Sequence, residues 1–192
     1  MTDRDIDQQL VERVQKALET RVHEVRLSLD AAAWQALCEG YLTNQYYAAD
    51  LWLDGTVVSQ VGIRSRGGGT RNGTKPGLKV DLDRYVPGQS LHGYGSLVLD
   101  NLWSDPTFLR ERLAFAVFEA MGFPAPRNAF ARLSVNGEPW GLYAVVEPVA
   151  RPFLSRALGE EERTPAVWRH LELADGVVEV RGEHGAVTER RP

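Results

Sequence analysis

The chain has 192 residues, of which 43% are hydrophobic and 25% are charged, and its formal net charge is −4. This length and composition predict one globular domain with a single hydrophobic core. The acidic balance argues against a general nucleic-acid-binding protein, which would carry a basic excess. The single cysteine, Cys38, excludes an internal disulfide and any zinc or redox site of the CxxC type.

The first residues, MTDRDIDQQL, are polar and acidic and lack the apolar core of a secretory signal. No later apolar run approaches the length of a membrane span. We therefore expect a cytoplasmic chain without a signal peptide or transmembrane segment. Apolar residues spaced four apart predict a weakly amphipathic helix or a partly ordered arm near the N-terminus. These residues are Ile6, Leu10, Val14, Leu18 and Val22.

Local patterns predict short elements at both ends of the chain. Residues 23–29 alternate as a strand does, and Asp30 then caps a short helix that Gly40 ends. Residues 151–159 predict another short helix, and residues 176–182 a further strand. The remaining C-terminal residues show no clear pattern.

Two turn signals organise the middle of the chain. Alternating runs flank both Asp54-Gly55 and Asn136-Gly137, which are strong hairpin signals. Further strands are expected at residues 78–82 and 96–103. Because one long helix interrupts these strands, the order predicts an α+β fold with a mostly antiparallel sheet and a central helix.

The central helix is predicted over residues 105–122. Asp105 suits its N-cap, Pro106 its first turn and Gly122 its C-terminal stop. Glu111 falls on the wide apolar face of this helix, so we expect it to point inward. A buried carboxylate must either pair with a cation or become protonated.

The glycine-rich segment at residues 66–75 resembles two phosphate loops without matching either. Thr74 precedes Lys75 where the P-loop motif needs lysine first, and a strand follows where that motif needs a helix. The kinase pattern G-x-G-x-x-G is also incomplete. The segment is therefore either an anion-binding loop flanked by Arg66, Arg71 and Lys75 or a solvated surface hairpin.

Lys79 leaves this loop on a strand and precedes the helix that carries Glu111. A lysine–glutamate pair of this kind holds nucleotide phosphates in kinase-like sites. The alternative is that Lys79 faces water beside Asp81 and Asp83. The sequence pattern alone leaves both interpretations open.

Other chemical motifs are weak. The four histidines have no metal-ligand spacing, and no nucleophile-elbow motif is present. The tryptophans and hairpins are compatible with a small carbohydrate-binding module, although core packing is the commoner use of tryptophan.

Several segments resemble, in sequence and order, the N-terminal half of the spore coat protein CotH family of atypical protein kinases. The most specific are SDPTFLRERLA with GFPAPR, and VNGEPWGLYAVVE, and the resemblance covers residues 22–158. It implies a kinase-like small lobe, ATP and Mg as cofactors, protein or coat-protein substrates, and a cytoplasmic or spore-coat location. The implied nucleotide-binding residues are Lys79, Glu111, Arg66, Gly68, Gly69, Val146 and Glu147.

Family members continue into a second half that supplies the catalytic and Mg-binding aspartates. Residues 160–192 contain one aspartate, Asp175, and no comparable motif, so no catalytic or metal-binding residue is assigned. We expect an N-terminal arm at 1–21, a CotH-like region at 22–159 and a tail at 160–192. Two hypotheses follow: a CotH-like protein kinase or its N-terminal fragment, and a non-catalytic coat or scaffold protein.

Overall fold

A computed structural model describes the backbone at residues 21–158, 169–172, 177–182 and 185–190, and the side chains of residues 21–157. The chain divides into two compact units, Met1–Phe153 and Leu154–Pro192. The amphipathic segment expected before residue 21 lies outside the described residues. No helix in the described ranges is long and apolar enough to cross a membrane.

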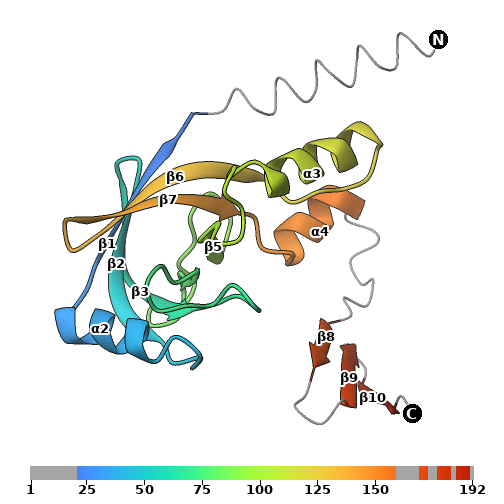
Figure 1. Cartoon of the computed structure of the whole chain (residues 1–192), viewed down its shortest axis with the longest axis horizontal. Coiled ribbons are helices and arrows are strands. Elements are labelled where there is room, and N and C mark those ends of the chain that lie inside the picture. Colours follow the sequence, from blue (N-terminus) through green and yellow to red (C-terminus); the bar gives the residue numbers. More distant parts are fainter. Residues whose placement is uncertain (1–20, 159–168, 173–176, 183–184, 191–192) are drawn as a thin grey trace. The chain divides into compact units, whose positions relative to one another are not determined.

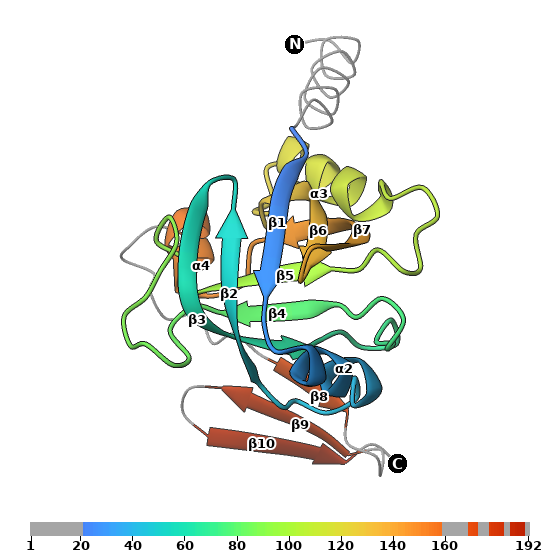
Figure 2. The same cartoon turned by 90° about the vertical axis from the view of Figure 1, so that its left-hand side faces the viewer.

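The first unit is a closed barrel of seven strands (Figures 1 and 2). Its strand order is β1-β2-β3-β4-β5-β7-β6, and every neighbouring pair is antiparallel except β1 and β6. The strands are β1 (His23–Ser28), β2 (Tyr47–Leu53), β3 (Thr56–Ser65), β4 (Leu78–Asp81), β5 (Ser96–Asp100), β6 (Asn128–Val135) and β7 (Glu138–Val146).

The expected α+β fold with a central helix and a kinase-like small lobe is wrong. Strand β1 pairs with β2 on one side and with β6 on the other, which closes the sheet on itself and removes its free edges. The described residues contain three short helices: α2 (Ala31–Glu39), α3 (Arg110–Ala120) and α4 (Arg151–Leu158). Helix α3 lies on the outside of the barrel (Figure 1), so it is not the centre of the fold.

The two hairpin predictions are confirmed. Asp54 and Gly55 have φ angles of 46° and 97°, and Asn136 and Gly137 have φ angles of 53° and 88°. Positive φ at both central residues is the requirement of a type I′ turn, which Asn or Asp followed by Gly meets at low cost. The Asn136 side chain also accepts a hydrogen bond of 2.9 Å from the Leu29 amide, which ties this turn to the end of β1.

Alternate strand residues fill the barrel interior, as the two-residue period of a strand requires. The buried set comes from all seven strands and includes Val25, Leu27, Leu51, Ile63, Val80, Leu99, Leu133 and Tyr143. Helix α2 begins as expected, because Asp30 accepts a hydrogen bond from the Ala33 amide at 2.9 Å. This helix lies across one end of the barrel (Figures 1 and 2) and contributes Leu37 to the core.

The second unit contains a three-stranded antiparallel sheet of order β10-β9-β8. Its strands are β8 (Arg169–Glu172), β9 (Val177–Gly182) and β10 (Gly185–Arg190). The strand expected at residues 176–182 is confirmed as β9. Helix α4, which was expected at residues 151–159, crosses the boundary between the two units.

Candidate functional site

Lys79 points away from the barrel interior. Its neighbours on β4, Leu78 and Val80, are fully buried, so the alternation of the strand places Lys79 on the outer face. The strand register sets Lys79 beside Val98 on β5, and Val98 beside Val146 on β7. Neighbouring strands are about 4.8 Å apart, so two strand spacings put roughly 10 Å between the backbones at Lys79 and Val146.

Four charged side chains interact electrostatically near the base of the glycine-rich loop. This charged cluster consists of Arg66, Lys75, Asp100 and Glu111. Arg66 Nη1 lies 4.0 Å from Asp100 Oδ2. Burial raises the pKa of the Glu111 carboxyl, as does the nearby negative charge of Asp100, whereas Arg66 acts in the opposite direction. The helix α3 thus brings Glu111 to the strand residues that flank the loop.

The expected ion pair between Lys79 and Glu111 is not formed. Lys79 Nζ lies 3.4 Å from Asp81 Oδ2 on the same strand. Glu111 Oε2 is buried and has no hydrogen-bond partner among the described residues. Glu111 does point inward, as the sequence indicated, but its charged neighbours are Arg66 and Asp100. The role of Lys79 and Glu111 in nucleotide binding stays a prediction.

Lys75 is the lysine that enters the charged cluster, and its burial was missed by sequence reasoning. Its Nζ donates a 2.8 Å hydrogen bond to the Leu142 carbonyl and lies 5.0 Å from the centre of the Tyr143 ring. Burial lowers the pKa of Lys75, while Asp100 counteracts this shift. Because Lys75 lies in a loop, strand periodicity carried no information about which way it points.

The glycine-rich loop between β3 and β4 has a defined conformation. The Asn101 side chain donates hydrogen bonds to the carbonyls of Thr70 and Lys75 at 3.0 and 2.8 Å. The Arg71 guanidinium donates to the Ser65 carbonyl at 3.0 Å, and the Arg66 amide donates to the Gly77 carbonyl at 2.7 Å. Arg71, expected to flank a bound anion, therefore holds the loop in place.

The glycines of this loop differ in whether the fold has room for a side chain and in whether the backbone adopts a positive φ angle. Gly67 has a φ of 130°, which other residues rarely adopt, and a Cβ at Gly73 would lie 2.3 Å from the Cys38 carbonyl oxygen. Gly68 and Gly69, by contrast, are exposed, and a Cβ at either would meet no atom within 4 Å. The packing of the described chain therefore does not explain why these two positions are glycine.

A separate cavity of about 420 Å³ opens beside the ends of β6 and β7. Val146 and Glu147, which the resemblance implied near an adenine, both line it, together with Leu97 and Val145. The Glu147 carboxylate accepts hydrogen bonds from the Tyr94 hydroxyl at 3.0 Å and from a main-chain amide at 2.9 Å. This carboxylate therefore braces the cavity wall, and the other side chains named here offer mainly apolar contact.

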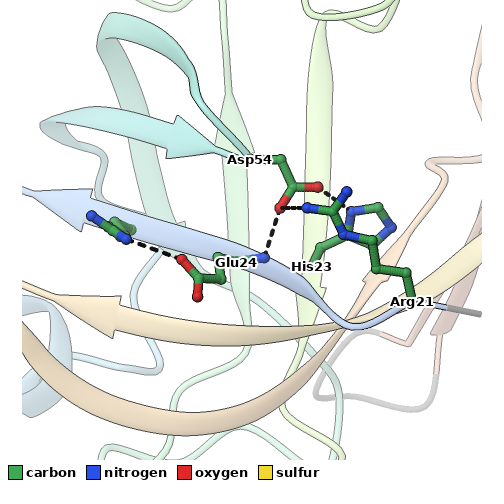
Figure 3. Close-up of polar contacts among 5 residues, drawn as sticks. Arg21, His23, Glu24 and Asp54 are labelled. Carbon is green, nitrogen blue, oxygen red and sulfur yellow. Dashed lines mark hydrogen bonds and ion pairs between the residues drawn. The ribbon is translucent and has the colours of Figure 1, made fainter.

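His23 is at the rim of this cavity and is held by the turn between β2 and β3. Figure 3 shows the Asp54 carboxylate between the His23 ring, the Glu24 amide and the Arg21 guanidinium. His23 Nδ1 lies 2.5 Å from Asp54 Oδ2, and the Glu24 amide donates to Asp54 Oδ1 at 2.9 Å. These bonds fix the start of β1 against the neighbouring hairpin.

The resemblance also implied Mg, which carboxylate ligands would hold. Among the described residues, no group of three or more His, Cys, Asp or Glu side chains is placed to hold a metal ion. The part of the chain that the structure describes therefore does not fit a protein-held Mg site, and no chemical step is assigned to one.

The comparison with family models decides the relationship. A model described as CotH kinase protein matches residues 63–175. The chain belongs to this CotH family. The matched range includes the glycine-rich loop, Lys79, Glu111 and the lining of the cavity at Val146 and Glu147, so the resemblance inferred from the sequence is confirmed.

A curated relative supports the same assignment. The Inner spore coat protein H-like protein of Bacillus subtilis (strain 168) is 34% identical over 79 residues, which cover 41% of this chain and 25% of the relative. The match spans about a quarter of the relative's length. The chain is thus a CotH-like protein similar to a protein named for the spore coat.

Proposed function

We propose that this CotH-family chain binds ATP and serves the phosphorylation of protein substrates, coat proteins among them, in or near the spore coat. The family description as a kinase protein and the name of the Bacillus relative support the choice of activity and substrate class. The geometry supports the part of the task that this chain can perform, which is to hold the nucleotide.

One observation carries the proposal: Arg66, the first residue after β3, lies at the base of the glycine-rich loop, and Lys79 is on the outer face of β4, the strand that follows this loop. Two cations beside a loop tip that carries no side chains suit the phosphates of a nucleotide. Any side chain at positions 68 and 69 would stand where phosphate oxygens approach the backbone, and glycine leaves this space open. Bound ATP would supply the phosphoryl group that is transferred.

The cavity beside Val146 is the site that we assign to the adenine base. The backbone of Val146, one of its lining residues, is roughly 10 Å from that of Lys79 across two strand spacings, and the apolar lining suits the faces of a planar ring. The main-chain amide of Glu147 already donates to the Arg127 carbonyl at 2.8 Å. Contact with the base therefore rests on apolar side chains more than on this amide.

Glu111 has a positioning role in this proposal. In the structure its pKa responds to the charges of Asp100 and Arg66, and a salt bridge with Lys79 would require Lys79 to leave Asp81. Phosphates that draw Lys79 and Arg66 together would bring both cations nearer the Glu111 carboxylate. The described residues supply binding and orientation of the nucleotide, and no acid, base or metal step is assigned to them.

Nucleotide binding tests the proposal directly. Titration calorimetry with ATP should show binding to the wild-type chain and at least a tenfold weaker affinity for Lys79→Ala and for Arg66→Ala, because each removes a charge-assisted phosphate contact worth about 1.5–3 kcal/mol. Arg132→Ala is the matched control, since Arg132 is an exposed cation on β6. Equal affinities in all four proteins would overturn the phosphate site.

A non-catalytic coat or scaffold protein is the second candidate. The spore-coat name of the relative favours it, because that name specifies a location and not a reaction. The two candidates differ in one measurement: a scaffold needs no nucleotide. Failure of the wild-type chain to bind ATP at millimolar concentration would favour the scaffold.

A further inference from the structure

Helix α3 exposes an apolar face to solvent. Its outward face consists of Leu109, Leu113, Val117 and Met121, spaced four apart, together with Phe118. Their exposed fractions are 37%, 37%, 39%, 64% and 48%. Eight of the fourteen large apolar side chains that are exposed in the described residues lie within residues 103–123. Such a concentration marks a surface that another segment or protein covers.

The inward side of α3 explains why this face is left outside. Arg112 and Ala116 are the buried residues of the helix, and the Arg112 guanidinium lies over the Phe130 ring at 5.3 Å. Glu111 lies on the same side, against the charged cluster. A surface helix normally turns its apolar stripe to the core. Here two charged residues are directed toward the barrel, and the row of apolar side chains described above faces solvent.

The N-terminal segment of the chain joins the barrel close to this helix. Strand β1 begins at His23 and pairs with β6, where His23 is opposite Ala131. Helix α3 rests on the same strand, since Phe115 and Phe130 share an apolar cluster and Arg112 Nη1 donates to the Asn128 carbonyl at 3.4 Å. Residues 1–20 are therefore attached about one strand spacing from the strand beneath α3.

The sequence of this segment complements the outward face. Its apolar residues Ile6, Leu10, Val14 and Leu18 recur every four positions, which is also the spacing along α3. Rows of side chains with this spacing interdigitate when two helices pack. Twenty residues in a helix would extend about 30 Å, whereas the 11 residues of α3 extend about 16 Å, so the segment is long enough. We propose that residues 1–20 pack through this apolar stripe against the outward face of α3.

Disulfide trapping tests the contact in the full chain. In a Cys38→Ser background, Val14→Cys is combined with Val117→Cys, which join the middles of the two stripes whichever way the segment runs. Mild oxidation should produce an intramolecular disulfide at least tenfold faster than in the matched control, Glu12→Cys with Val117→Cys. Glu12 is two positions from Val14 and would lie on the opposite side of a helix.

Each other result would overturn the proposal. Equal rates in the two variants would show that the stripe does not face α3. A disulfide that links two chains would assign the surface to a second copy, and an absence of any disulfide, with folding verified by circular dichroism, would leave residues 1–20 off the helix. The outward-facing position of Val117 makes loss of the barrel by this substitution unexpected.

Hydrogen exchange gives an independent measurement without introduced cysteines. Leu10→Asp combined with Leu18→Asp should raise the exchange rates of α3 amides roughly tenfold, because the covering segment would be released. The polar control, Asp7→Asn combined with Glu12→Gln, should leave those rates unchanged. Unchanged rates in the leucine variant would contradict the proposal.

Discussion

The interior of the barrel and the surface around α3 differ in which side chains they bury. Inside, each strand contributes apolar side chains such as Leu51 and Leu99, which are 1% exposed. Around α3, Glu111 and Arg112 are directed toward the barrel while leucine and valine face solvent. The interior therefore stabilises the fold, whereas α3 leaves a row of apolar side chains uncovered by the described residues.

The largest expected effect comes from a cavity in the interior. Leu51→Ala should lower the free energy of unfolding by about 2–5 kcal/mol, because it removes transfer energy and leaves a void. Leu42→Ala is the control at a side chain that is 69% exposed, and it should change stability by no more than about 0.5 kcal/mol. Urea denaturation measures both. Similar losses in the two variants would contradict the division into interior and surface.

The glycine-rich loop provides the next contrast, between a glycine that packs and one that does not. Gly73→Ala should cost about 1–3 kcal/mol, because the added methyl group would collide with the main-chain carbonyl of Cys38. Gly68→Ala should be nearly neutral to stability, since open space surrounds its Cα. Thermal unfolding of both variants checks the difference. A strongly destabilised Gly68→Ala protein would show that the loop tip is packed after all.

Local features of the fold were predictable from the sequence because their causes are local. The Asp54-Gly55 and Asn136-Gly137 turns need positive φ, and the residue pairs that allow it are visible in the sequence. The cap at Asp30 follows the same logic. The C-terminal stop at Gly122 is also confirmed, because its φ is 84° and the Phe123 amide bonds the Phe118 carbonyl at 2.8 Å.

Features that depend on distant pairing were not predictable. Barrel closure rests on the parallel contact of β1 with β6, which are separated by about a hundred residues and leave no local signal. The central helix begins at Arg110 and not at Asp105, whose carboxylate instead bonds the Arg110 amide at 2.7 Å. Glu111 was expected inward on the wide apolar face of α3, and it does lie inward as Phe115 does, but Phe118, on the same expected face, is 48% exposed. The spacing of apolar residues identifies the faces of a helix, but it does not show which face will pack against the barrel.

The candidate site was predictable in part for the same reason. Alternation along β4 correctly separated Lys79 and Asp81 from the interior, and Glu111 does approach the strands. The sequence could not show that Lys79 pairs with Asp81, nor that Lys75 joins the charged cluster from a loop. Such contacts depend on side-chain reach in three dimensions.

The pH dependence of stability should distinguish Glu111 from an exposed acid. Burial and Asp100 raise the pKa of Glu111, so its ionisation disfavours the folded state, and the associated stability is lost as pH rises through the raised pKa. Glu111→Gln should therefore gain stability relative to wild type at pH 7 but not at pH 4. The control Glu119→Gln, at an exposed position of the same helix, should show no such trend. If the unfolding free energies of the two variants changed with pH in the same way, a buried Glu111 carboxyl with a raised pKa would be contradicted.

The smallest expected effect concerns Asp54. This residue is exposed, and its pKa is shifted in the opposite direction to that of Glu111. The Glu24 amide and His23 lower the pKa of Asp54, so its stabilising contribution is present at neutral pH and is lost as the pH falls through the lowered pKa, below about 4. Asp54→Asn keeps a residue that tolerates positive φ and removes only the charge, so it should cost about 0.5–1 kcal/mol at pH 7. Asp83→Asn, on an exposed side chain, is the control. If the difference between Asp54→Asn and wild type persisted unchanged at pH 2, the loss would come from the turn and not from the charge that anchors His23.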